Sequence, residues 1–143
     1  MAPVFFESGF RMGAKDYLEL ILKSHVLPWI QVNFPNNEDV VLMQDGAPCH
    51  TAKSVQNWLK ENINFWPKEV WPPSLPDLNP LDFSLWAYVQ SKACDRQHPN
   101  IGDLKSAVSE AWSNMPASYV RVTCSRFRRR VEAVIESEGG YID

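Results

Sequence analysis

The sequence is poor in three features that each define a class of protein: cysteine, long apolar runs and an excess of one charge. Its three cysteines, Cys49, Cys94 and Cys124, are odd in number and widely spaced, which favours free thiols in a reducing compartment over a disulfide framework. No apolar run approaches the roughly 18 residues of a membrane span. The formal net charge is −3, so a nucleic-acid partner would need a local site rather than a generally basic surface.

The composition that remains is typical of a globular protein. Apolar residues make up 45% of the 143-residue chain and charged residues 22%, which is enough for one domain, or part of one, with a real core. The abundant Trp and Phe argue against disorder. The first residues lack the basic start of a secretory signal. We therefore expect an intracellular protein with no membrane association.

Three segments have the composition of β-strands. The best is Asp39–Gln44, whose apolar run Val40-Val41-Leu42-Met43 suits a strand buried on both faces. Asn64–Trp71 is a shorter candidate despite Pro67, and Val4-Phe5-Phe6 is a third. The first two are separated by a helical pattern, which favours parallel pairing.

The remaining periodic segments predict helices. Ala14 to about Val32 has a wide apolar stripe that Pro28 interrupts. Further helices are predicted over Thr51–Asn62, from Asn79 to about Ala93, from a cap at Asn100, and from Pro116 to about Ser137. This order predicts an α/β fold with a helical C-terminal layer.

Two acidic residues occupy positions that suit metal binding. Asp45 ends the best strand, and Asp82 lies in the first turn of a helix that Asn79 would cap and Pro80 would begin. Carboxylates are preferred ligands of magnesium and manganese, and two such ions about 4 Å apart can drive phosphodiester chemistry. The alternative is structural: a turn residue, and a helix-start acid worth about 0.3–1 kcal/mol.

Two motifs around these acids resemble the catalytic core of mariner-type DNA transposases. They are Gln44-Asp45-Gly46-Ala47-Pro48-Cys49-His50-Thr51-Ala52 and Trp71-Pro72-Pro73-Ser74-Leu75-Pro76-Asp77-Leu78-Asn79-Pro80-Leu81-Asp82. The resemblance implies a ribonuclease H-like three-layer α/β fold with an Asp, Asp, Asp/Glu triad. It makes Asp45 the second triad acid and Asp82 the third, both catalytic and both metal ligands.

The sequence departs from the family pattern at the first triad acid. The family's first Asp lies on an upstream strand, and neither Asp16 nor Asp39 matches that position. The resemblance therefore implies that residues 1–143 form a single partial catalytic domain, truncated at its N-terminus. A two-ion site for Mg²⁺ or Mn²⁺ is expected only if the missing acid is supplied, so we expect the isolated chain to be inactive.

The function implied by the resemblance is DNA transposition, by metal-dependent strand cleavage and strand transfer. The expected partner is DNA, as transposon ends and target, with a possible homodimer and a nuclear location. Two alternatives remain open. One is a non-catalytic domesticated module that binds nucleic acid or protein, and the other is a decayed transposon relic.

Several residues near the motifs are candidates for DNA contact. His50 could touch a phosphate, bond near Asp45 or serve only as a cap, and a zinc role beside Cys49 lacks ligands at zinc spacing. Lys53 could contact DNA or be solvated, and Asn79 could do so besides capping its helix. Arg126 belongs to a basic cluster with Arg121, Arg128, Arg129 and Arg130. We favour a solvated helix face for this cluster, paired in part with Glu132, Glu136 and Glu138.

Overall fold

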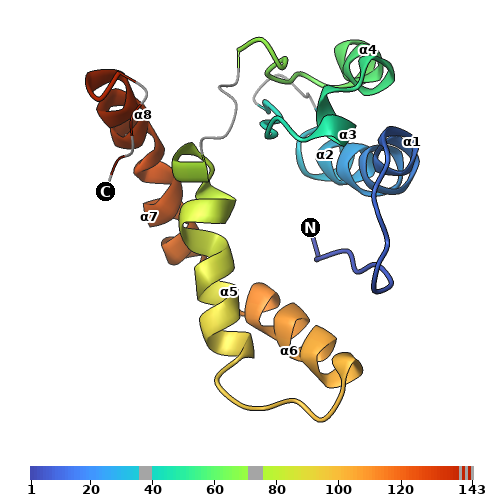
Figure 1. The fold of residues 1–143 in the computed structure, drawn as a ribbon, viewed down its shortest axis with the longest axis vertical. Helices are drawn as coiled ribbons and strands as arrows, with labels where there is room; N and C mark the ends of the chain where they lie inside the picture. Colours follow the sequence, from blue (N-terminus) through green and yellow to red (C-terminus); the bar gives the residue numbers. More distant parts are fainter. Residues whose placement is uncertain (36–39, 71–75, 139, 141, 143) are drawn as a thin grey trace. The chain divides into compact units, whose positions relative to one another are not determined.

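The computed structural model describes residues 1–35, 40–70, 76–138, 140 and 142. Within them the chain forms two compact units (Figure 1). The first comprises residues 6–74 with Met1, and the second residues 75–143 with Ala2–Phe5. Predictions that fall on Asp39, on residues 71–75 of the second motif, or on Gly139 and Tyr141 lie outside the described residues.

The first unit begins with the long helix predicted from Ala14, which is confirmed. It consists of α1 (Ala14–Asp16), η1 (Tyr17–Val26) and α2 (Leu27–Asn33). Its middle part, η1, is π-helical, and the Leu27 N–H donates to the Leu22 carbonyl five residues back. The interruption predicted at Pro28 takes the form of a change in helix type. Pro28 lies in the first turn of α2, where it has no N–H to donate.

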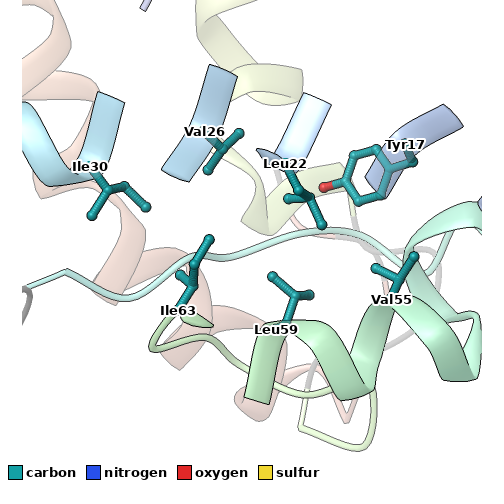
Figure 2. Close-up of a cluster of buried hydrophobic side chains, with 7 residues drawn as sticks. All are labelled: Tyr17, Leu22, Val26, Ile30, Val55, Leu59 and Ile63. Atoms are coloured by element: carbon teal, nitrogen blue, oxygen red, sulfur yellow. The ribbon is translucent and has the colours of Figure 1, made fainter. Parts of the chain in front are cut away.

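The core of the first unit lies between this helix and α4 (Lys53–Asn62). The helix contributes Tyr17, Leu22, Val26 and Ile30, while α4 and the residue after it contribute Val55, Leu59 and Ile63 (Figure 2). Leu22, Val55 and Leu59 have no exposed surface. Each such side chain contributes about 1.5–3 kcal/mol by leaving water, so this stripe fixes α4 against the long helix.

The helix predicted over Thr51–Asn62 is wrong at its start. A one-turn helix, α3 (Pro48–Thr51), comes first, and Ala52 is extended, with φ −58° and ψ 138°. The His50 carbonyl accepts a hydrogen bond from Gln56 Nε2 at 2.9 Å. A side-chain amide thus bonds to a carbonyl that a continuous helix would bond with a backbone N–H, and the chain breaks between α3 and α4.

The predicted strands meet at a single parallel bridge between Leu42 and Phe65. The Leu42 N–H donates to the Asn64 carbonyl at 2.9 Å, and the Trp66 N–H donates to the Leu42 carbonyl at 3.1 Å. Parallel pairing is confirmed at this point, but neither segment forms a longer strand in the described residues. The segment after Phe65 turns instead, with the Val70 N–H bonded to the Pro67 carbonyl.

The strand predicted at Val4-Phe5-Phe6 is also wrong, because these residues are irregular. A strand is stable only with a neighbour that satisfies its backbone groups, and none of the described residues pairs with this segment. The described residues therefore form no extended strand, and the predicted α/β layers are not confirmed.

The second unit is helical, as predicted for the C-terminal part. It contains η2 (Pro76–Leu78), η3 (Leu81–Leu85), α5 (Trp86–Ala93), α6 (Ile101–Ser113), α7 (Ala117–Ser125) and α8 (Phe127–Glu136). Helices α5 and α6 lie side by side (Figure 1) around buried Val89, Ala93 and Ala111. The predicted cap of α6 is confirmed, since the Asp103 N–H donates to Asn100 Oδ1 at 2.9 Å.

The last predicted helix, from Pro116 to Ser137, is divided in two at Arg126. The Arg126 N–H bonds to the Thr123 carbonyl, three residues back rather than four. The Ser125 hydroxyl also donates to the Val122 carbonyl. These local bonds tighten the chain between α7 and α8, and each helix takes its own direction (Figure 1).

Candidate active site

Asp45 lies three residues beyond the bridge residue Leu42, and its side chain begins the next turn. Oδ1 accepts a hydrogen bond from the Ala47 N–H at 3.0 Å, an Asx-type turn that is local in sequence. Pro48 follows as the first residue of α3, where its fixed φ suits the start of a helix. The motif sequence itself therefore sets the direction of the Asp45 side chain.

His50 makes the second contact with Asp45. Its Nδ1 lies 2.6 Å from Asp45 Oδ1, and the His50 and Asp45 side chains are 20% and 56% exposed. Both contacts use Oδ1, and no described residue bonds to Oδ2. One carboxylate oxygen is thus held in place while the other is open to a ligand.

His50 is in turn held by the core of the first unit. The Tyr17 ring packs on the His50 ring with centroids 4.3 Å apart, and the Tyr17 hydroxyl donates to Gln44 Oε1 at 2.8 Å. Burial raises the pKa of Tyr17 above its ordinary value, and nearby Cys49 and Asp45 raise it further. Tyr17 is therefore a neutral donor at physiological pH.

The turn that carries Asp82 is held through its backbone. The Asn79 carbonyl accepts hydrogen bonds from the N–H groups of Asp82 (2.9 Å) and Phe83 (3.0 Å), and Asn79 Oδ1 accepts one from Leu81 at 3.1 Å. The cap predicted at Asn79 is confirmed. The Asp82 side chain is exposed, and no described residue bonds to its carboxylate.

The other candidate residues are exposed. Lys53 is the first residue of α4, and Arg126 lies between α7 and α8. The structure brings His50 to Asp45 and Asn79 to the turn of Asp82. Asp45 belongs to the first unit and Asp82 to the second, and each is placed within its own unit.

The basic cluster is not uniformly solvated. Arg128 pairs with Glu132 at 3.0 Å, as the sequence suggested. Arg130, however, contacts Asp77 through both a hydrogen bond and an ion pair. No local pattern in the sequence predicts this contact. The sequence predicts Tyr17 only as a core residue of the apolar stripe, and its packing on His50 is not predicted.

The donor chemistry of the two acids fits a hard divalent cation. Carboxylate oxygens are preferred ligands of Mg²⁺ and Mn²⁺, with water completing the set. In the part of the chain that the structure describes, no three His, Cys, Asp or Glu side chains gather into a metal cluster. Asp45 and Asp82 therefore have the ligand chemistry of a divalent-cation site, as two separate carboxylates. The zinc alternative at Cys49 and His50 gains no further ligand from the described residues.

The chain is similar in sequence to known transposases. The profile of the DDE superfamily endonuclease family matches residues 2–105. The Tc3 transposase of Caenorhabditis elegans is 27% identical to this chain over 93% of the chain, which spans 39% of that protein's length.

No helix in the described ranges is long and apolar enough to cross a membrane.

Solved structures show the same fold. The Mos1 transposase catalytic domain, solved with raltegravir and Mn, superposes with a TM-score of 0.80 at 21% identity, covering 94% of this chain and 68% of that one. The Mos1 transposase paired-end complex with the left transposon end gives a TM-score of 0.80 at 22% identity, covering 96% and 39%. The backbone thus follows the ribonuclease H-like fold of the Mos1 catalytic domain.

Proposed function

The chain belongs to the DDE superfamily endonuclease family, as a mariner-type transposase catalytic domain, and from this premise we propose that Asp45 and Asp82 are catalytic metal ligands. The activity would be Mg²⁺- or Mn²⁺-dependent cleavage and transfer of DNA strands. The observation that carries the proposal is the geometry of Asp45. Its Oδ1 is occupied by Ala47 and His50, whereas Oδ2 is bonded to no described residue.

The chain's own residues would prepare these ligands. Because the contacts of Asp45 restrict its rotation, less conformational entropy is lost when a cation binds. Asp82 stands on a helix turn that Asn79 fixes. Bound metal ions would supply activation of a water or a 3′ hydroxyl and stabilisation of the leaving oxygen.

The proposal requires a third carboxylate beyond these two. Asp16 is a poor candidate, since it lies in α1 at the start of the long helix, whereas the first acid of the family lies on a strand. Asp39 lies outside the described residues. We propose that the third carboxylate is not among residues 1–143, and that this chain alone does not cleave DNA.

DNA is the proposed substrate. Solved Mos1 complexes with transposon ends support this class of partner. His50, Lys53, Asn79 and Arg126 would contact the DNA, and the reaction would take place in the nucleus. Pairing of two copies would allow two transposon ends to be processed together.

A nicking assay tests the proposal. The purified chain is compared with a chimera in which the segment of Tc3 transposase that precedes the matched region is fused ahead of Met1. We expect the chain alone to leave supercoiled plasmid intact, and the chimera to nick it with Mg²⁺ or Mn²⁺. Asp45→Ala and Asp82→Ala in the chimera should each abolish nicking, while Glu61→Ala, an exposed residue of α4, should not.

Two outcomes would contradict the proposal. Nicking by the chain alone that disappears in Asp45→Ala would show that no third acid is needed. A folded chimera that binds DNA without nicking it would instead favour the non-catalytic binding module.

A further inference from the structure

Arg130 of α8 reaches back to the turn that precedes Asp82. Its Nε donates to the Asp77 backbone carbonyl at 2.5 Å, across 53 positions of sequence. Its Nη2 lies 3.6 Å from Asp77 Oδ1, and the Arg130 and Asp77 side chains are only 20% and 24% exposed. A contact this sheltered is screened less than a surface ion pair.

The same guanidinium also covers Phe83. Its carbon lies 4.6 Å from the centroid of the Phe83 ring, within the range of a cation–π contact. Asp77 precedes Asp82 by five positions, and Phe83 follows Asp82 directly. One side chain therefore binds the chain on both sides of the proposed metal ligand.

Helix α7 holds the residue after Phe83. The Ser84 hydroxyl lies 2.8 Å from the Tyr119 hydroxyl and 3.2 Å from the Thr123 hydroxyl. Ser84 and Thr123 are buried, at 8% and 2% exposure. Helices α7 and α8 lie beyond the region that the family profile matches, yet both contact the segment around Asp82.

We propose that Arg130 is a positioning residue for Asp82. It fixes Asp77 and Phe83 and so sets the direction from which the Asp82 carboxylate meets its metal ion, a role that rests on the proposed function. Arg130 forms its ion pair with Asp77, and the Asp82 carboxylate is bonded to no described residue. A lysine can replace it only in part, because an ammonium lacks the planar fork that serves carbonyl, carboxylate and ring together.

Two readouts test the role of Arg130 in the chimera with the Tc3 segment, because the proposed metal site needs a third carboxylate. The first is Fe²⁺-directed hydroxyl-radical cleavage of the polypeptide, which maps where a divalent ion sits near residue 82 and near residue 45. The second is hydrogen exchange of the Asp82 and Phe83 amides, both bonded to the Asn79 carbonyl. The variants are Arg130→Gln and Arg130→Lys, with Arg129→Gln, an exposed neighbour on α8, as the matched control.

We expect Arg130→Gln to speed exchange of the Asp82 and Phe83 amides about tenfold, as local opening becomes easier. Cleavage near residue 82 should fall severalfold while cleavage near residue 45 is unchanged. Arg130→Lys should recover only part of the loss. Arg129→Gln should match the wild type in both readouts.

The proposal is overturned if Arg130→Gln behaves like Arg129→Gln in exchange and in cleavage. If the wild-type chimera shows no cleavage at either acid, the proposed metal function fails, and unchanged exchange in Arg130→Gln would still overturn the positioning role. Should Arg130→Gln lose protection in α6 as well, Phe83→Leu removes the ring while keeping an apolar side chain. Faster exchange of the Asp82 amide in Phe83→Leu then supports the positioning role, and unchanged exchange overturns it.

Discussion

In the first unit the side chain of Asp45 is fixed by its neighbours, whereas in the second unit the backbone around Asp82 is fixed and the side chain is left free. Asp45 shares one oxygen with Ala47 and His50. Asp82 stands on a turn held by Asn79 and, through residues on either side, by Arg130. Two proposed metal ligands can thus be prepared by different means, so substitutions around each should act on different observables.

The largest effect is expected in the core beneath Asp45. Leu59→Ala removes a side chain with no exposed surface and leaves a cavity, so unfolding of the first unit should become about 2–5 kcal/mol easier. Hydrogen exchange of the α4 amides under increasing denaturant measures this change. Val32→Ala, at a side chain that is 81% exposed, is the control. A loss no larger than that of Val32→Ala would contradict the role of this core.

A smaller effect is expected in the second unit from Ser84→Ala. The change leaves the buried Thr123 hydroxyl without its Ser84 contact, which should cost about 1–3 kcal/mol. Exchange of α5 and α7 amides measures it. Ser91→Ala is the matched control, since the Ser91 hydroxyl is exposed and bonds only to the Tyr88 carbonyl. Equal stability of the two variants would show that the Ser84–Thr123 contact does not stabilise the packing of α7 on the helix that carries Asp82.

The two acids themselves should respond differently to alanine. Asp45→Ala removes the acceptor of the Ala47 N–H and of His50, so exchange of the Ala47 amide should speed up and stability should fall by about 1 kcal/mol. Asp82→Ala removes only a helix-start charge worth about 0.3–1 kcal/mol, and the amides bonded to Asn79 should stay protected. Loss of that protection in Asp82→Ala would show that the backbone around Asp82 depends on its side chain, which contradicts the proposed difference between the two acids.

The smallest effect comes from the ionisation of Tyr17, which affects stability only at alkaline pH. Its folded-state pKa is raised, so the contribution to stability is fully present below the unfolded value of about 10 and is lost as pH rises above it. Alkaline unfolding, followed by tyrosinate absorbance, should therefore show a steeper loss of stability in the wild type than in Tyr17→Phe. Identical pH profiles would show that Tyr17 is not sheltered by the core.

The features that the sequence predicted correctly are those with local causes. The stripe from Tyr17 to Ile30 and the caps at Asn79 and Asn100 depend on residues a few positions apart, so propensity and spacing reveal them. Of the predicted strands, the described residues form only the parallel bridge between Leu42 and Phe65, because a strand depends on a partner that spacing cannot supply. The break at Ala52 depends on Gln56, and the Asp77–Arg130 contact joins distant segments; neither leaves a local pattern.

The π-helical stretch η1 has a consequence for changes in chain length. The inward residues Tyr17 and Leu22 are five positions apart, while Val26 and Ile30 follow at steps of four. Deleting one residue between Tyr17 and Leu22 would make every step four, the period of an ordinary helix face, so the core could absorb the deletion. The Tyr17 ring, however, would shift by about 1.5 Å along the axis relative to His50. The additional residue between Tyr17 and Leu22 is therefore not needed for packing of the core, but it sets the position of the Tyr17 ring against His50.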